Sequence, residues 1–135
     1  MRDYFINEGN KIGYVDTKFD TGLNLQSKKL TASAAIVKGQ LVKISGDMTV
    51  APATALTDAV IGVAMFDYKS GDEVVVETEG LVYLTAGGTI TAGDFVGAAA
   101  DGKCAKVTSA STDRHVGIAI SSAVANGACI VKLSL

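Results

Sequence analysis

An internal repeat constrains the fold of this chain more than any other feature. The two copies share Lys/Ala-Gly-Gln/Asp-Leu/Phe-Val at 38–42 and 92–96, Thr-Asp at 57–58 and 112–113, and Gly-Val/Ile-Ala at 62–64 and 117–119. The offset grows only from 54 residues (Gly39 to Gly93) to 56 residues (Gly71 to Gly127). Two copies are too few for a solenoid, which needs at least three. The repeat therefore predicts a duplicated unit inside one domain, with copies at about 37–77 and 91–133.

Each copy has the pattern of short β-strands. Short apolar runs are separated by Gly, Asp, Ser and Thr, and no long stretch has a helical period. Strands are predicted at 41–44, 48–50, 60–66, 73–77 and 81–84, and Asp101-Gly102 is a strong hairpin-turn signal. Such strands with glycine turns are typical of an all-β fold, either a small β-barrel or a β-sandwich. Gly62 and Gly117 fall in mid-strand, where glycine indicates a bulge or a closely approaching backbone.

The bulk composition excludes several classes of protein. A length of 135 residues suits one domain, and 15 glycines with one proline suit many tight turns. A net charge of −2 argues against a generic nucleic-acid binder. Residues 1–5 do not begin a secretory signal, and no apolar run approaches the roughly 20 residues of a membrane span. We therefore expect a chain made in the cytoplasm, without a membrane anchor.

Residues 1–35 differ in character from the β-domain predicted at 36–135, and they are predicted to form an extended N-terminal arm. This segment is polar and irregular, yet it holds four of the eight aromatic residues, namely Tyr4, Phe5, Tyr14 and Phe19. Aromatic side chains concentrate binding energy at interfaces, so these four are candidate contacts to a partner protein. The alternative is that they hold the arm on its own β-domain.

The two cysteines and the single histidine do not form a metal motif. Cys104 and Cys129 lie far apart, with no Cys-x-x-Cys in the chain, so a zinc site of Cys and His alone is not expected. We expect two buried free thiols, as in a chain that stays in a reducing compartment. No catalytic, metal-binding or cofactor-binding residue is predicted.

Residues 97–103 have the Gly-x-x-x-x-Gly-Lys spacing of a phosphate-binding P-loop. The next residue is Cys104, where a P-loop has the Ser or Thr that holds magnesium. The following residues alternate like a strand, whereas a P-loop opens a helix that receives the phosphate. We therefore expect a hairpin turn at this segment and no nucleotide binding.

His115 and the two Thr-Asp pairs are the remaining candidates for chemistry. The repeat places His115 at the position of Val60 in a mostly apolar strand, which favours a surface or interface histidine over a general base. Asp58 and Asp113 could act as paired carboxylates. Their recurrence before the same strand instead favours turns in which the side chain bonds nearby backbone. None of these residues predicts an enzyme.

Several of these motifs together resemble a known family. The resemblance covers nearly the whole chain and rests on the order of segments 4–10, 36–42, 57–64, 71–76 and 88–94. In that order they are similar to the tailed-phage capsid cement or head-decoration protein family. The resemblance implies an all-β structural protein that binds the outer surface of a phage head and stabilises the shell.

The same resemblance implies the partners and the location. The partners are the major capsid protein and further copies of the chain, as a homodimer or homotrimer, with no cofactor, membrane or specific nucleic acid. Tyr4, Phe5, Tyr14 and Phe19 are then candidate contacts to the capsid or to a sister subunit. The protein is expected in the virion, after synthesis in the host cytoplasm. The alternative is a small β-barrel ligand-binding or adhesion module, for example for glycans. Such modules usually display Trp or Tyr for sugar stacking, and this chain has no Trp.

Overall fold

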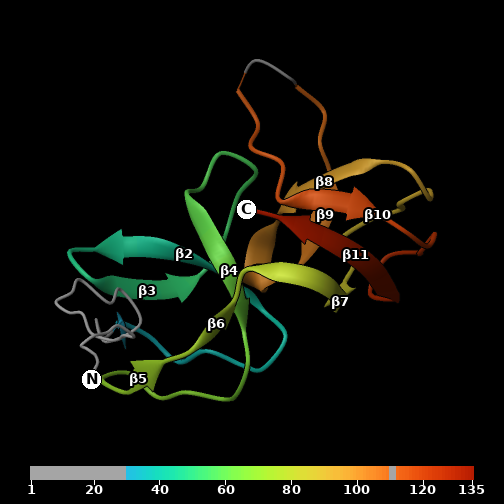
Figure 1. Ribbon diagram of the computed structural model, residues 1–135. Helices are drawn as coiled ribbons and strands as arrows, with labels where there is room; N and C mark the ends of the chain where they lie inside the picture. The colour runs from blue at the N-terminus through green and yellow to red at the C-terminus, as the bar shows by residue number, and fades with distance from the viewer. Residues whose placement is uncertain (1–29, 110–111) are drawn as a thin grey trace, which may run out of the picture.

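The computed structural model describes residues 30–109 and 112–135, which form two β-sheets (Figure 1). The first sheet contains β1 (Leu30–Ala32), β2 (Leu41–Gly46), β3 (Thr49–Pro52), β4 (Val60–Ala64), β5 (Glu73–Val74) and β6 (Val76–Glu77). The second contains β7 (Glu79–Thr85), β8 (Phe95–Ala98), β9 (Cys104–Lys106), β10 (Gly117–Ala119) and β11 (Ala128–Ser134). Their strand orders are β5-β1-β3-β2-β4-β6 and β7-β11-β10-β8-β9. The predicted all-β fold is confirmed, as a sandwich-like pair of sheets and not a closed barrel.

The strand pairing of the first half is repeated in the second. Val42 pairs with Gly62 in the first sheet, and Val96 pairs with Gly117 in the second. In the same way, Val63 pairs with Glu77 and Ile118 pairs with Lys132. Equivalent residues lie 54 positions apart from Val42 to Val96 and 55 apart from Gly62 to Gly117, so one residue is inserted between them. The duplicated sequence therefore builds the same hydrogen-bonded unit twice.

The repeated unit begins earlier in the chain than the sequence motifs indicated. β1 has the sequence Leu-Thr-Ala, and the same three residues recur at 84–86, across the end of β7. Ala32 pairs in parallel with Val50, and the equivalent Ala86 forms a parallel bridge with Cys104. From Leu30 onward, the described part of the predicted arm therefore belongs to the first sheet. The arm over residues 1–29 lies outside the described residues and stays a prediction.

The turns before β5 in the first half and before β11 in the second correct one detail of the predicted alignment. The sequence motif matched Gly71 with Gly127, but the residue equivalent to Gly71 is Asn126. Both have positive φ, +95° at Gly71 and +66° at Asn126. The Gly71 N–H donates to the Ala32 carbonyl and the Asn126 N–H donates to the equivalent Ala86 carbonyl. Asparagine tolerates this left-handed conformation better than most residues, so it can replace glycine here.

Gly62 and Gly117 stand where another backbone approaches closely, as their mid-strand position predicted. A Cβ atom at Gly62 would lie 2.5 Å from the Glu77 carbonyl oxygen. A Cβ atom at Gly117 would overlap the carbonyl oxygen of Lys132, the residue equivalent to Glu77. Both contacts are to backbone of a paired strand, which cannot move aside without breaking the sheet. A side chain is therefore excluded at the same place in both halves.

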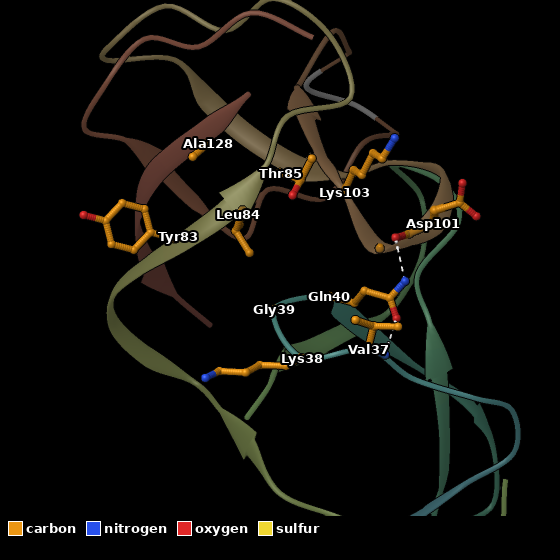
Figure 2. Close-up of a pocket in the computed structure, with 11 residues that line it drawn as sticks. Val37, Lys38, Gly39, Gln40, Tyr83, Leu84, Thr85, Asp101, Lys103 and Ala128 are labelled. Atoms are coloured by element: carbon orange, nitrogen blue, oxygen red, sulfur yellow. Dashed lines mark hydrogen bonds between the residues drawn. The ribbon is translucent and has the colours of Figure 1, made fainter. Parts of the chain in front are cut away.

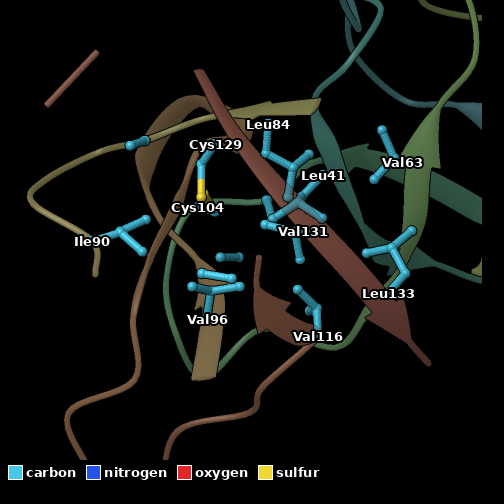
Figure 3. Close-up of a cluster of buried hydrophobic side chains, with 14 residues drawn as sticks. Leu41, Val63, Leu84, Ile90, Val96, Cys104, Val116, Cys129, Val131 and Leu133 are labelled. Carbon is cyan, nitrogen blue, oxygen red and sulfur yellow. The ribbon is translucent and has the colours of Figure 1, made fainter. Parts of the chain in front are cut away.

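Two hydrophobic cores follow from this duplication. The first core contains six buried residues of the first half: Ala32, Ile36, Val42, Val50, Ala64 and Val74. The six equivalent residues of the second half are Ala86, Ile90, Val96, Cys104, Ala119 and Cys129, and all belong to the larger second core (Figure 3). That core also buries Leu41, Ala53 and Val63 of the first half. These three residues therefore join the two halves.

Candidate functional site

The junction between the halves is held by polar contacts as well as by the shared core. The Gln40 Nε2 donates to the Asp101 carbonyl at 2.9 Å (Figure 2), and the Gly102 N–H of the same turn donates to the Ala53 carbonyl at 2.8 Å. Beside these bonds lies an open cleft of about 390 Å³, whose lining includes Lys38, Tyr83 and Lys103. The Lys103 ammonium donates to Asn126 Oδ1 at 2.8 Å. The polar groups at this cleft are therefore used in contacts within the chain, both between the two halves and inside the second half.

The segment with P-loop spacing adopts a turn between two strands. Gly97 lies inside β8, the 3₁₀ turn η3 covers Ala100–Gly102, and Cys104 begins β9. Asp101 and Gly102 have positive φ, as the hairpin signal predicted. Because a strand follows this turn, no helix N-terminus is available at this point to receive a phosphate.

The two Thr-Asp pairs form equivalent loops. Asp58 Oδ2 accepts hydrogen bonds from the Thr54 N–H at 2.6 Å and the Ala55 N–H at 2.9 Å. Asp113 Oδ2 accepts the equivalent bonds from the Thr108 and Ser109 N–H groups, both at 2.9 Å. Each aspartate therefore closes its own loop, as the turn interpretation predicted.

The electrostatics of the two aspartates agree with these contacts. Burial acts to raise the pKa of Asp58. Hydrogen bonds from Thr54 and Ala55, together with the Lys43 ammonium 3.6 Å away, lower it by more, so the net pKa lies below its ordinary value. Hydrogen bonds from the Thr108 and Ser109 backbone also lower the pKa of Asp113. Both carboxylates are thus held in the charged form, which suits a loop staple and not a proton donor.

His115 lies on the surface of the second half. Its ring centroid is 5.2 Å from that of Phe95, and the two rings are tilted by 60°. Phe95, Val107, Asp113 and His115 line a hollow of about 280 Å³. The Asp113 carboxylate in this hollow is already bonded to its own loop. The arrangement presents an aromatic pair to solvent, as expected for a surface or interface histidine.

Both cysteines are free and buried, as the sequence predicted. They lie next to each other in the second core (Figure 3). Burial, with the neighbouring Cys129, raises the pKa of Cys104 to about 12. A thiol of that kind stays protonated near neutral pH and is a poor nucleophile. In the first half Val50 and Val74 hold the equivalent positions, so the thiols fill space as small apolar groups.

The aromatic residues proposed as interface contacts, Tyr4, Phe5, Tyr14 and Phe19, all lie outside the described residues. Within residues 30–109 and 112–135, no three His, Cys, Asp or Glu side chains come together in a group that could hold a metal ion. The described part of the chain also contains no helix with the length and apolar character needed to span a membrane.

The sequence did not reveal a group of exposed apolar side chains on the second sheet. Leu81 and Tyr83 of β7 are 66% and 72% exposed, and Phe95 of β8 is 53% exposed. Ile118 of β10 and the following Ile120 are also exposed. We call these five residues the open face. The alternation of exposed and buried residues along β7 and β10 was the available signal, but strand order was needed to place them together.

The comparisons with known proteins agree with this architecture. No curated protein matches the chain in sequence. Among solved structures, the chain is similar to the head fiber gp8.5 N base of bacteriophage phi29, with 21% identity and a TM-score of 0.63. The match covers 78% of this chain and 91% of the phi29 chain, and at this identity it shows a common fold.

The family comparison covers most of the sequence. The model of the phage cement protein family matches residues 22–135, which include both copies of the repeat and both sheets. The chain therefore belongs to the phage cement protein family and is a structural component of a phage particle.

Proposed function

We propose that this protein binds the outer surface of a phage head and stabilises the shell. The observation that carries the proposal is the match of the cement-protein family over residues 22–135. The similarity in fold to a base of phage head fibers supports a location on the outside of the head. The partner is then the major capsid protein, after synthesis of the chain in the host cytoplasm.

We also infer that the protein acts without catalysis. The polar groups that drew attention in the sequence have structural contacts: the aspartates close loops, Lys103 bonds Asn126, and the thiols are buried in the core. A binding role needs only surfaces, and several weak contacts suffice when one homodimer or homotrimer engages several capsid subunits at once.

For the capsid contact, we propose residues 1 to about 30, with Tyr4, Phe5, Tyr14 and Phe19 as anchors. Aromatic side chains contribute most per residue when buried at an interface. The charges of this segment are mixed, for example Lys11 and Lys18 against Asp16 and Asp20, so net charge alone does not explain binding. The alternative partner for these four aromatic side chains is a sister subunit.

The shell-binding proposal is tested by adding purified protein to phage heads that lack it. We expect the protein to co-sediment with the heads in a saturable way and to raise the temperature at which they rupture. Heads that neither bind the protein nor gain heat resistance would contradict the proposal.

The anchor residues are tested by replacing Tyr4, Phe5, Tyr14 and Phe19 together with Ser. We expect affinity for heads to fall about 30-fold or more, with the melting temperature of the free protein nearly unchanged. A matched control replaces Lys11 and Lys18 with Ser and should bind almost normally. If the aromatic variant unfolds, these residues belong to the protein's own core. If it binds heads normally, they are not the anchors.

A further inference from the structure

The five residues of the open face lie in two neighbouring rows of the second sheet. Leu81 pairs with Lys132, Lys132 with Ile118, and Ile118 with Phe95, which links β7, β11, β10 and β8. Tyr83 lies in the next row, opposite Ile130. The Ile120 N–H donates to the Ile130 carbonyl at 2.7 Å, which continues this second row. A row of large apolar side chains with a single charge is typical of the centre of an interface.

The first half contains the same row, and there it is covered. Leu41 pairs with Val63 and Val63 pairs with Glu77, so these residues are equivalent to Phe95, Ile118 and Lys132. Leu41 is 0% exposed and Val63 is 5% exposed, because both are buried in the core of the second half. The unit that covers this row is itself a copy of the repeat. In the first half, this row is therefore covered by another unit of the same kind.

We propose that the open face is a self-association surface, covered in the assembled protein by a second copy of this chain. The first-half row provides the precedent inside one chain, and the open face offers larger side chains than its covered counterpart. Lys132, the one charged residue in the row of Leu81, Ile118 and Phe95, stands where the first half has Glu77, so this row favours an acidic group opposite it. This inference deepens the proposed function, on which it rests, since an oligomer presents several capsid-binding segments at once.

The test compares two double variants of the full chain by analytical ultracentrifugation over a range of concentrations. The test variant carries Phe95→Ser and Ile118→Ser on the open face. The control carries Phe66→Ser and Val75→Ser, two residues that are 59% and 58% exposed on the first half. We expect the wild type to associate, the test variant to associate at least about 30-fold more weakly, and the control to change by less than about threefold.

Three results would overturn the inference: a wild-type chain that stays monomeric, a test variant that associates like the wild type, or a control that weakens as much as the test variant. If the test variant does not fold, Tyr83→Ser replaces it, because Tyr83 is the most exposed of the five.

Head binding of the same variants is measured in parallel. Normal association with lost head binding would assign the open face to the capsid protein, which overturns the inference and leaves the proposed function intact. If the wild type self-associates but never binds heads, the proposed function is overturned and the self-association surface stands.

Discussion

The two halves of this protein have the same strand pairing but different surroundings. Leu41 and Val63 of the first half are buried, whereas the equivalent Phe95 and Ile118 of the second half are exposed. The local structure at these positions is the same, because the cross-strand partners correspond. What differs is whether another unit packs on the row. Whether this row is buried therefore depends on which half packs against it, and not on the local strand pairing.

The hairpin turns show the same difference. Gly102 of the second half packs against the first half, where a Cβ atom would lie 2.6 Å from the Cβ of Gln40. Met48 holds the equivalent position in the first half, also with positive φ, and its side chain is exposed. Nothing in the position's backbone requires glycine in one half only. Glycine is required at Gly102 because the first half packs against it, whereas the exposed turn at Met48 tolerates a side chain despite its positive φ.

The largest expected effect tests what the halves share. Gly117→Ala would place a Cβ atom against the Lys132 carbonyl, which is fixed by the pairing of β10 with β11. We expect a loss of about 4 kcal/mol or more in the free energy of unfolding, measured by urea denaturation. Gly62→Ala should have a comparable effect in the first half. A loss below about 1 kcal/mol in either variant would show that the equivalence of the two glycines is wrong.

An intermediate effect tests where the halves differ. Leu41→Ala removes a fully buried side chain from the shared core, and we expect a loss of about 3 kcal/mol. Phe95→Ala removes an aromatic residue from the equivalent but open position, and at concentrations where the chain is monomeric the loss should stay below about 1 kcal/mol. The measurement is the urea midpoint of both variants. Similar losses would mean that the row is covered in both halves.

The smallest effect concerns the aspartate loops. Asp58→Ala removes bonds to the Thr54 and Ala55 N–H groups, and we expect a loss of about 1–2 kcal/mol. Asp113→Ala should cost less, because Gly97 stands where the first half has Lys43. Both losses are measured by urea denaturation. A larger loss of unfolding free energy in Asp113→Ala than in Asp58→Ala would contradict this account.

The same loops predict a dependence on pH. The pKa of Asp58 is lower in the folded state than its ordinary value, so its contribution is complete above that ordinary value, near 4. The contribution is lost as the pH falls through the lower pKa of the folded state. We expect the urea midpoint of the wild type to fall in this acidic range and that of Asp58→Ala to fall less steeply.

Most of the fold could be predicted from residue patterns, because turns and strand alternation are local. The Asp101-Gly102 turn, the two mid-strand glycines and the loop role of Asp58 and Asp113 all follow from short segments. The start of the repeat at Leu30 was missed, although Leu-Thr-Ala recurs at 84–86. Three common residues beside a polar segment carry little signal until their pairing with β3 and β9 is seen.

The open face could not be found in the same way. Its residues come from β7, from β8, and from β10 with the residue that follows it, and these strands adjoin through β11 only once the chain has folded. Equally, the sequence did not distinguish Leu41 from Phe95, since both are large apolar residues in the same strand of the repeat. The repeated unit follows from the order of the residues, because hydrogen-bonded turns and alternating side chains depend on near neighbours. Which unit covers the other emerges only in the folded molecule, because it depends on contacts between strands far apart in the chain.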